Sequence, residues 1–290
     1  MKLNNQKNTI SKISIKVFWS FLFLIIPIVG NAQKLPNVQL NNLRAPINIK
    51  IDGKATEWND NFQAYNHATD IYYTICNDDN NLYLVVHAKN PDVLTKITNR
   101  GVILVINPSA GKIDKDAISI AYPIFELQYG NKPYIRFSNA SGLTYAQRVA
   151  MEANPDSMLS VANKKLHDNE KYIRTSGMSS VDTLLSIYNN KGIVAREGFD
   201  KGMIYTYELA VPLKDLKLSL ASPIKFAYHI VLQGLDVDKD FGIKETKMAD
   251  GSSVISFAQG AATIKDDNMP AVISTTDFWG EYTLAKKIVK

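Results

Sequence analysis

Residues 47–92 read INIKIDGKATEWNDNFQAYNHATDIYYTICNDDNNLYLVVHAKNPD, and this stretch decides the fold class. Its second half holds two runs rich in Tyr, Ile, Leu and Val, namely Ile71–Cys76 and Asn81–Ala88. The four residues Asn77–Asn80 join these runs, and a cluster of Asn and Asp between two strand-like runs is typical of a β-hairpin. The stretch therefore predicts antiparallel β-structure.

The first half of the stretch predicts a short strand of its own. Three isoleucines alternate with polar residues over Ile47–Ile51, and the run stops at Asp52-Gly53, a pair that favours a tight turn. A single tryptophan, Trp58, follows in a polar loop. This order of features, a strand, Asp-Gly, Trp and then a Leu-Tyr-Leu strand after an acidic turn, resembles the start of the family 9 carbohydrate-binding modules of the DOMON-like superfamily.

The rest of the chain continues the pattern of short strands separated by turn residues. Gly101–Asn107 is a continuous β-branched run, which is typical of a strand buried on both faces. Further strands are predicted at 117–122, 125–129, 133–138, 203–212, 225–232 and 278–284. This series favours an all-β fold, an antiparallel β-sandwich with jelly-roll or immunoglobulin-like layering, over an α/β fold. The segment Glu-Leu-Ala-Val-Pro-Leu at 208–213 resembles the later half of the same family.

The first 32 residues have the three parts of a secretory signal peptide. Four lysines and no acidic residue surround or precede the apolar run Val17–Val29, and Gly30-Asn31-Ala32 supplies small residues for cleavage. The alternative is a membrane anchor, which needs an apolar run of roughly 20 residues, and this run is shorter. We therefore expect an exported protein, periplasmic or extracellular, whose mature chain has no transmembrane helix.

Residues 33–290 are expected to form a single sandwich domain, because no sharp change in composition marks a boundary. The segment from about 140 to 200 mixes helical and polar stretches, and we interpret it as an insertion between sandwich strands. A helix is predicted at Val181–Tyr188, where apolar residues share one helical face after Ser179-Ser180. A strand at Lys171–Arg174 is the alternative within this segment.

The charge balance argues against a nucleic-acid-binding surface. The chain has 33 Lys and Arg against 28 Asp and Glu, and four of the basic residues lie in the leader. The mature chain is therefore close to neutral, and neither nucleic acid nor an anionic membrane is an expected partner. The single cysteine, Cys76, allows no intramolecular disulfide, so the hydrophobic core must hold the fold together.

The resemblance implies a non-catalytic module that binds a saccharide, and aromatic residues are the candidate ligand-binding groups. Sugar rings commonly stack on Trp or Tyr, with amide and carboxylate groups at the rim. The candidates are Trp58, Tyr72, Tyr73 and Trp279, and packing in the core is the alternative for both tryptophans. Successive strand residues point to opposite faces, so one of the two adjacent tyrosines is expected to be exposed. The sequence shows no nucleophile elbow, phosphate-binding glycine loop or paired-histidine zinc motif in support of an enzyme.

Calcium is the expected metal, on the acidic loop that holds Asp236, Asp238 and Asp240. Alternating carboxylates on a loop can converge on a hard cation, and calcium sites occur in the resembled family; a solvated turn is the alternative. Some DOMON relatives bind haem, for which Met203 and His229 would be the axial ligands, so a haem-carrying electron-transfer protein is a second hypothesis. An exported scaffold that binds another protein is the third.

Overall fold

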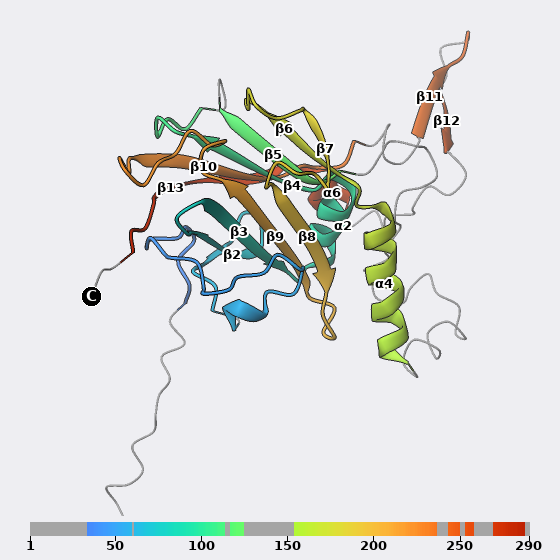
Figure 1. The fold of residues 1–290 in the computed structure, drawn as a ribbon. Helices are drawn as coiled ribbons and strands as arrows, with labels where there is room; N and C mark the ends of the chain where they lie inside the picture. The colour runs from blue at the N-terminus through green and yellow to red at the C-terminus, as the bar shows by residue number, and fades with distance from the viewer. Residues whose placement is uncertain are drawn as a thin grey trace, which may run out of the picture. The chain divides into compact units, whose positions relative to one another are not determined.

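The computed structural model describes residues 34–59, 61–113, 117–124, 154–236, 243–249, 253–257 and 269–287. The expected leader and the strands predicted at 125–129 and 133–138 lie outside these ranges. Within them the chain forms an all-β sandwich of two antiparallel sheets accompanied by a few helices (Figure 1). The predicted fold class is confirmed. None of the described helices has the length and apolarity needed to cross a bilayer.

The first sheet has five strands in the order β1-β2-β3-β9-β8. The β2–β3 pair is the hairpin that the sequence predicted, and β9 pairs with β3 from one end to the other. Segments far apart in the sequence therefore form the middle of this sheet. The strands are β1 (Ala64–Asn66), β2 (Ile71–Asn77), β3 (Asn81–Ala88), β8 (Val194–Phe199) and β9 (Tyr205–Pro212).

The second sheet has six strands in the order β13-β10-β4-β5-β6-β7. They are β4 (Val102–Asn107), β5 (Ile118–Ile124), β6 (Tyr172–Ser176), β7 (Leu184–Ser186), β10 (Lys225–Leu232) and β13 (Thr276–Thr283). A separate pair consists of β11 (Ile243–Lys247) and β12 (Ser253–Phe257). The helical elements are the 3-10 turn η1 (Thr56–Trp58), α2 (Pro91–Arg100), α4 (Pro155–Asn169) and α6 (Met269–Ile273).

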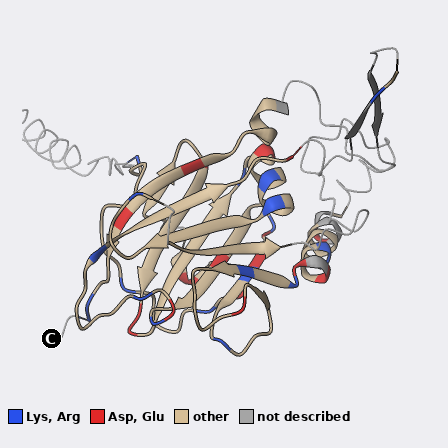
Figure 2. Cartoon of the chain, turned by 90° about the horizontal axis from the view of Figure 1, so that it is seen from above, with Lys and Arg blue, Asp and Glu red and all other residues tan. Residues whose placement is uncertain are grey.

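Large tyrosines fill the space between the two sheets. The largest fully buried side chains are headed by Tyr73, Tyr122, Tyr205, Tyr207 and Tyr228. The hydroxyls of Tyr73 and Tyr228 are hydrogen-bonded at 2.9 Å across the interior, and the rings of Tyr122 and Tyr207 lie 5.9 Å apart. The sandwich strands carry few charged side chains, as Figure 2 shows. The interior is thus mostly apolar, and the Tyr73–Tyr228 pair shows how two of its buried hydroxyls satisfy each other.

A second, smaller hydrophobic cluster covers the outer face of the first sheet. Trp58 and Phe62, from the segment before β1, pack there against Cys76, Tyr83 and Val85. The middle strands of this sheet are therefore buried on both faces, as the burial of every residue of β9 shows.

The turn at Asp52-Gly53 belongs to this covering segment and does not end a hairpin strand. Glu208 on β9 accepts hydrogen bonds from the backbone N–H groups of Asp52 and Gly53, at 2.9 and 2.8 Å. Gly53 has a φ of 79°, and a Cβ there would lie 2.6 Å from the backbone oxygen of Glu197. The turn thus needs glycine for both its conformation and its close approach to β8.

Two of the predicted elements are wrong. No strand forms over Ile47–Ile51, because Asn48 adopts a left-handed conformation with a φ of 62° that interrupts the extended run. The predicted helix at Val181–Tyr188 is replaced by β7, because burial alternates with a period of two: Leu185 and Ile187 are buried, whereas their neighbours are exposed.

The segment from 140 to 200, expected to be an insertion, contributes strands to both sheets. Its described part begins with α4, which contacts β8. β6 and β7 then extend the second sheet, and β8 forms one edge of the first. β6 corresponds to the alternative strand proposed at Lys171–Arg174.

Side-chain amides protect both edges of the first sheet. Beyond the short β1, Gln39 donates to the carbonyl oxygen of Ile75 at 2.8 Å and accepts from its N–H at 2.8 Å. On β8, Asn163 of α4 makes the same two hydrogen bonds with Phe199, at 2.9 and 2.7 Å. Both amides occupy backbone groups that would otherwise be open to pairing with another strand.

The arm before β1 and the end of β13 meet at Asn77. The N–H of Asn77 donates to the carbonyl oxygen of Leu43 at 3.1 Å, and its side-chain oxygen accepts from the N–H of Ala285 at 2.7 Å. Tyr282 completes the junction, because its hydroxyl donates to the carbonyl oxygen of Leu43 at 2.8 Å. These bonds fasten the first and last parts of the sandwich to each other.

Gly280 on β13 lies opposite Tyr228 on β10, and the tyrosine ring occupies the space a side chain would need. A Cβ on Gly280 would lie 2.1 Å from the Tyr228 ring carbon Cζ. We expect Gly280→Ala to lower the free energy of unfolding by about 1–3 kcal/mol, as for an overpacked core. Urea denaturation measures this change.

The control is Gly111→Ala, whose new Cβ meets side-chain atoms no closer than 3.5 Å. We expect it to change the free energy of unfolding by less than about 0.5 kcal/mol. Equal losses for the two variants would contradict the steric explanation.

Candidate functional site

The structure separates the four aromatic residues that the sequence proposed as ligand-binding groups. Trp58 is 5 % exposed in the outer cluster, and Tyr73 is fully buried between the sheets. Trp279 is half-buried on the outer face of the second sheet, stacked on His229 with ring centroids 4.2 Å apart. Tyr72 is half-buried on the outer face of the first sheet. Of the two adjacent tyrosines, Tyr72 is thus the one that faces outward, half-buried, and the two tryptophans do not lie together.

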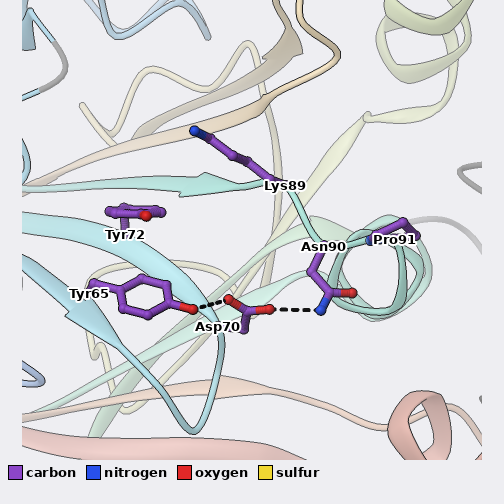
Figure 3. A pocket seen from close by; sticks show the side chains of 6 residues that line it. All are labelled: Tyr65, Asp70, Tyr72, Lys89, Asn90 and Pro91. Carbon is purple, nitrogen blue, oxygen red and sulfur yellow. Dashed lines mark hydrogen bonds between the residues drawn. The ribbon is translucent and has the colours of Figure 1, made fainter.

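Tyr72 lines an open depression of about 340 Å³ (Figure 3). The side chains come from β1, β2 and the first residue of α2, together with the two connecting loops. The lining residues are Tyr65, Asp70, Tyr72, Lys89, Asn90 and Pro91.

Strand pairing places the two aromatic rings of the depression side by side. Tyr65 on β1 is the register partner of Tyr72 on β2, and their ring centroids are 4.6 Å apart. The turn between these strands ends at Asp70, whose φ of 52° turns the chain sharply. Asp is among the few residues that adopt this conformation readily.

A continuous hydrogen-bond network fixes the polar side of the depression. The Tyr65 hydroxyl and the Asn90 amide both donate to the Asp70 carboxylate, the latter at 2.7 Å (Figure 3). Asn90 in turn accepts from the N–H of Asp92 at 2.9 Å and so caps helix α2. Both ends of the Asn90 amide are therefore assigned, and its orientation is fixed. The hydrogen bond to Asp70 raises the pKa of Tyr65 to about 12, so this hydroxyl remains protonated at neutral pH.

Lys89 lies over the ring of Tyr72, with its Nζ 5.6 Å from the ring centroid. This lysine is exposed, and an exposed cation–π contact contributes only about 0.5–1 kcal/mol. A ligand that stacks on Tyr72 can therefore displace the lysine at little cost. The depression thus offers an aromatic platform beside an oriented carboxylate, an amide and an ammonium group.

The proposed metal and haem ligands do not assemble into a site in the described structure. Asp236 is half-buried after β10, whereas Asp238 and Asp240 lie outside the described residues. The described residues contain no cluster of three or more His, Cys, Asp or Glu side chains that could hold a metal ion. Met203 packs against the interior core, whereas His229 faces outward and pairs with Asp277 at 2.7 Å.

A pair of buried carboxyl groups, which the sequence analysis did not single out, lies inside the sandwich. Glu170 and Glu197 are 2 % and 8 % exposed, and each carboxyl group affects the pKa of the other. The Tyr122 hydroxyl donates to Glu170, and the Tyr205 hydroxyl donates to Glu197. The sequence of β8 could have indicated the burial of Glu197, because alternate residues of a strand share a face and Glu197 alternates with the buried Ala195 and Phe199.

The burial of this pair favours its protonated form. Burial raises the pKa of both carboxyl groups, and the charge of Glu170 raises that of Glu197 further. Among the described residues Glu197 Oε1 has no donor when both groups are ionised, and one proton shared by the two carboxyls supplies it. His167 approaches Glu170 at 3.7 Å and, with Arg196, favours the ionised form of Glu170.

Comparisons with known proteins do not assign the chain to a family. No protein-family model matches it, and no curated protein matches it. The resemblance to family 9 carbohydrate-binding modules stays a prediction.

We expect the free energy of unfolding to fall as pH rises above about 4.5, the ordinary pKa of Glu. Above this pH the Glu170–Glu197 pair of the folded state still binds a proton that the unfolded chain releases. Glu197→Gln keeps an acceptor for Tyr205 and adds a donor for Glu170, but it cannot ionise. It should therefore raise the free energy of unfolding at pH 8. At pH 4 the variant and the wild type should be equally stable.

Urea denaturation at both pH values measures this difference. Glu281→Gln is the control, because Glu281 is a surface residue in an ion pair with Lys225 at 3.0 Å, and its loss should bring no stabilisation at pH 8. A Glu197→Gln variant that is no more stable than the wild type at pH 8 would show that the pair carries no ionisation penalty.

Proposed function

We propose that this chain is an exported, non-catalytic saccharide-binding protein whose binding site is the depression beside Tyr72. The observation that carries this proposal is the position of Tyr72, a half-buried ring at an open depression, next to an oriented Asp70–Asn90 pair. Saccharide sites combine these features, because the C–H face of a sugar is apolar and its rim is rich in hydroxyls.

The polar groups of the depression have unused hydrogen-bonding capacity that suits sugar hydroxyls. Each carboxylate oxygen of Asp70 accepts one hydrogen bond from the described residues and has a further lone pair. The Asn90 amide nitrogen donates one of its two protons to Asp70 and has a second proton to offer. A pair of neighbouring ring hydroxyls could therefore donate to Asp70 and accept from Asn90 while the ring lies on Tyr72.

Two features of the sequence also support the proposal. The leader pattern supports secretion to the periplasm or the medium, and the sequence offers no catalytic motif that would turn binding into cleavage. The geometry favours the saccharide over haem, because the two residues proposed as axial ligands do not converge: Met203 packs against the interior core from the connection between β8 and β9, whereas His229 lies on the outer face of the second sheet and pairs with Asp277.

The decisive variant for this function is Tyr72→Ala. Titration calorimetry of the purified protein against oligosaccharides built on glucose, galactose and mannose, neutral and acidic, should identify a saccharide that binds. Removing the aromatic platform should weaken that affinity at least tenfold, or about 1.4 kcal/mol.

Tyr188→Ala serves as the matched control, because Tyr188 is 67 % exposed and does not line the depression. Its affinity should equal that of the wild type, and thermal unfolding should show that both variants are folded. The proposal fails if no oligosaccharide binds the wild type, or if Tyr72→Ala binds as tightly as Tyr188→Ala.

A further inference from the structure

A second depression adjoins the one beside Tyr72 and shares Asp70 and Asn90 with it. It has a volume of about 400 Å³, within the range of about 300–1,000 Å³ that is usual for small-molecule sites. Helix α2 forms one wall, and the segment from α6 to the start of β13 forms the other. Because the two depressions share residues, one ligand can extend from Tyr72 into the second depression.

Lys96 of α2 lines the second depression and is only 3 % exposed. Its ammonium group donates to the carbonyl oxygen of Ser274 at 3.2 Å and to the hydroxyl of Thr276 at 2.9 Å. Both of these partners are neutral, and an ammonium group has a third proton to donate. A cationic group is therefore held in place at the depression without a carboxylate bound to it among the described residues.

A negatively charged partner would stabilise the buried ammonium group of Lys96. Desolvation lowers the pKa of Lys96, because burial disfavours the charged form of the ammonium group. Asp92, one turn earlier on the same helix, acts in the opposite direction and reduces this effect in part. Buried charges are normally paired, so an anion bound at Lys96 would offset the desolvation penalty of the ammonium group in the free protein.

Two further features favour an anion here over a neutral group. The N-terminal turn of α2, which borders both depressions, carries the positive end of the helix dipole, and the Asp92 carboxylate, which is in this turn and lines the second depression, offsets it in part. Lys89 adds a second positive charge at the far side of the first depression. The negative charge of Asp70 is already bound by the Tyr65 hydroxyl and the Asn90 amide.

We propose that the ligand is an acidic saccharide, whose carboxylate or sulfate group binds Lys96 in the second depression while a sugar ring lies on Tyr72 in the first. This inference rests on the proposed function and names the class of its ligand. The alternative is that Lys96 has a structural role only, tying α2 to β13 through Ser274 and Thr276.

The test compares matched pairs of oligosaccharides that differ only in charge. Titration calorimetry measures binding of neutral oligosaccharides of galactose, glucose and mannose, of their uronate counterparts, and of sulfated counterparts. We expect one acidic member to bind the wild type at least tenfold tighter than its neutral partner, and its affinity to fall with rising salt. The uronate and sulfate probes distinguish the two sources of negative charge.

Lys96→Met removes the ammonium group and keeps the apolar stem. We expect it to reduce the preference for the acidic member to less than threefold, with binding of the neutral member unchanged. The control is Lys191→Met, an exposed lysine that lines neither depression, which should retain the full preference. If Lys96→Met does not fold, the charge preference and salt dependence of the wild type still decide the question.

The outcomes separate this inference from the function it rests on. A wild type that binds neutral and acidic members equally, in a manner that Tyr72→Ala abolishes, overturns the acidic ligand and leaves saccharide binding in place. A Lys96→Met variant that loses stability but keeps the tenfold preference assigns Lys96 a structural role and also overturns the inference. A wild type that binds none of the saccharides overturns both.

Discussion

The hydrogen bonds from Asp52 and Gly53 to the Glu208 carboxylate are the contact on which the layering of the structure depends. Glu208 is 1 % exposed; its burial raises the pKa of the carboxyl group, and the two backbone N–H donors oppose that shift. The contact holds the segment before β1 against the outer face of the first sheet, and it buries β3 and β9 on both faces. The half-exposed Tyr72 lies beside this cover, where a ligand can still reach an aromatic ring of the sheet.

The parts of the fold that the sequence predicted correctly are those decided by local patterns. The β2–β3 hairpin and the strands β4 and β10 follow from runs of β-branched and aromatic residues between turn residues, which need no knowledge of distant contacts. The prediction failed over Ile47–Ile51, where one residue, Asn48, takes a left-handed conformation. It also failed at β7, where pairing with β6 overrides a helical pattern.

The candidate site could be predicted only in part, for a related reason. Tyr72 was predictable because alternation along a strand requires one of two adjacent tyrosines to face outward. The contribution of Asp70 and Asn90 could not be predicted, because Asp70 lies between β1 and β2 whereas Asn90 lies between β3 and α2. Lys96 forms hydrogen bonds with Ser274 and Thr276 across a sequence separation of about 180 residues, and a contact of this range cannot be predicted from a local sequence pattern. The buried Glu170–Glu197 pair likewise exists only because α4 and β8 meet.

The junction at Asn77 has a consequence for how the chain reaches this structure. Leu43 and Tyr282 are separated by 239 positions in the sequence, so the arm before β1 cannot acquire its last partner until almost the whole chain is available. Contacts of such long range form slowly, because ordering the intervening chain costs entropy before the contact contributes. During synthesis, at about 5–20 residues per second, that wait is on the order of ten seconds or more. The early strands must spend this interval without their final neighbours, at the stage when aggregation competes most strongly with folding.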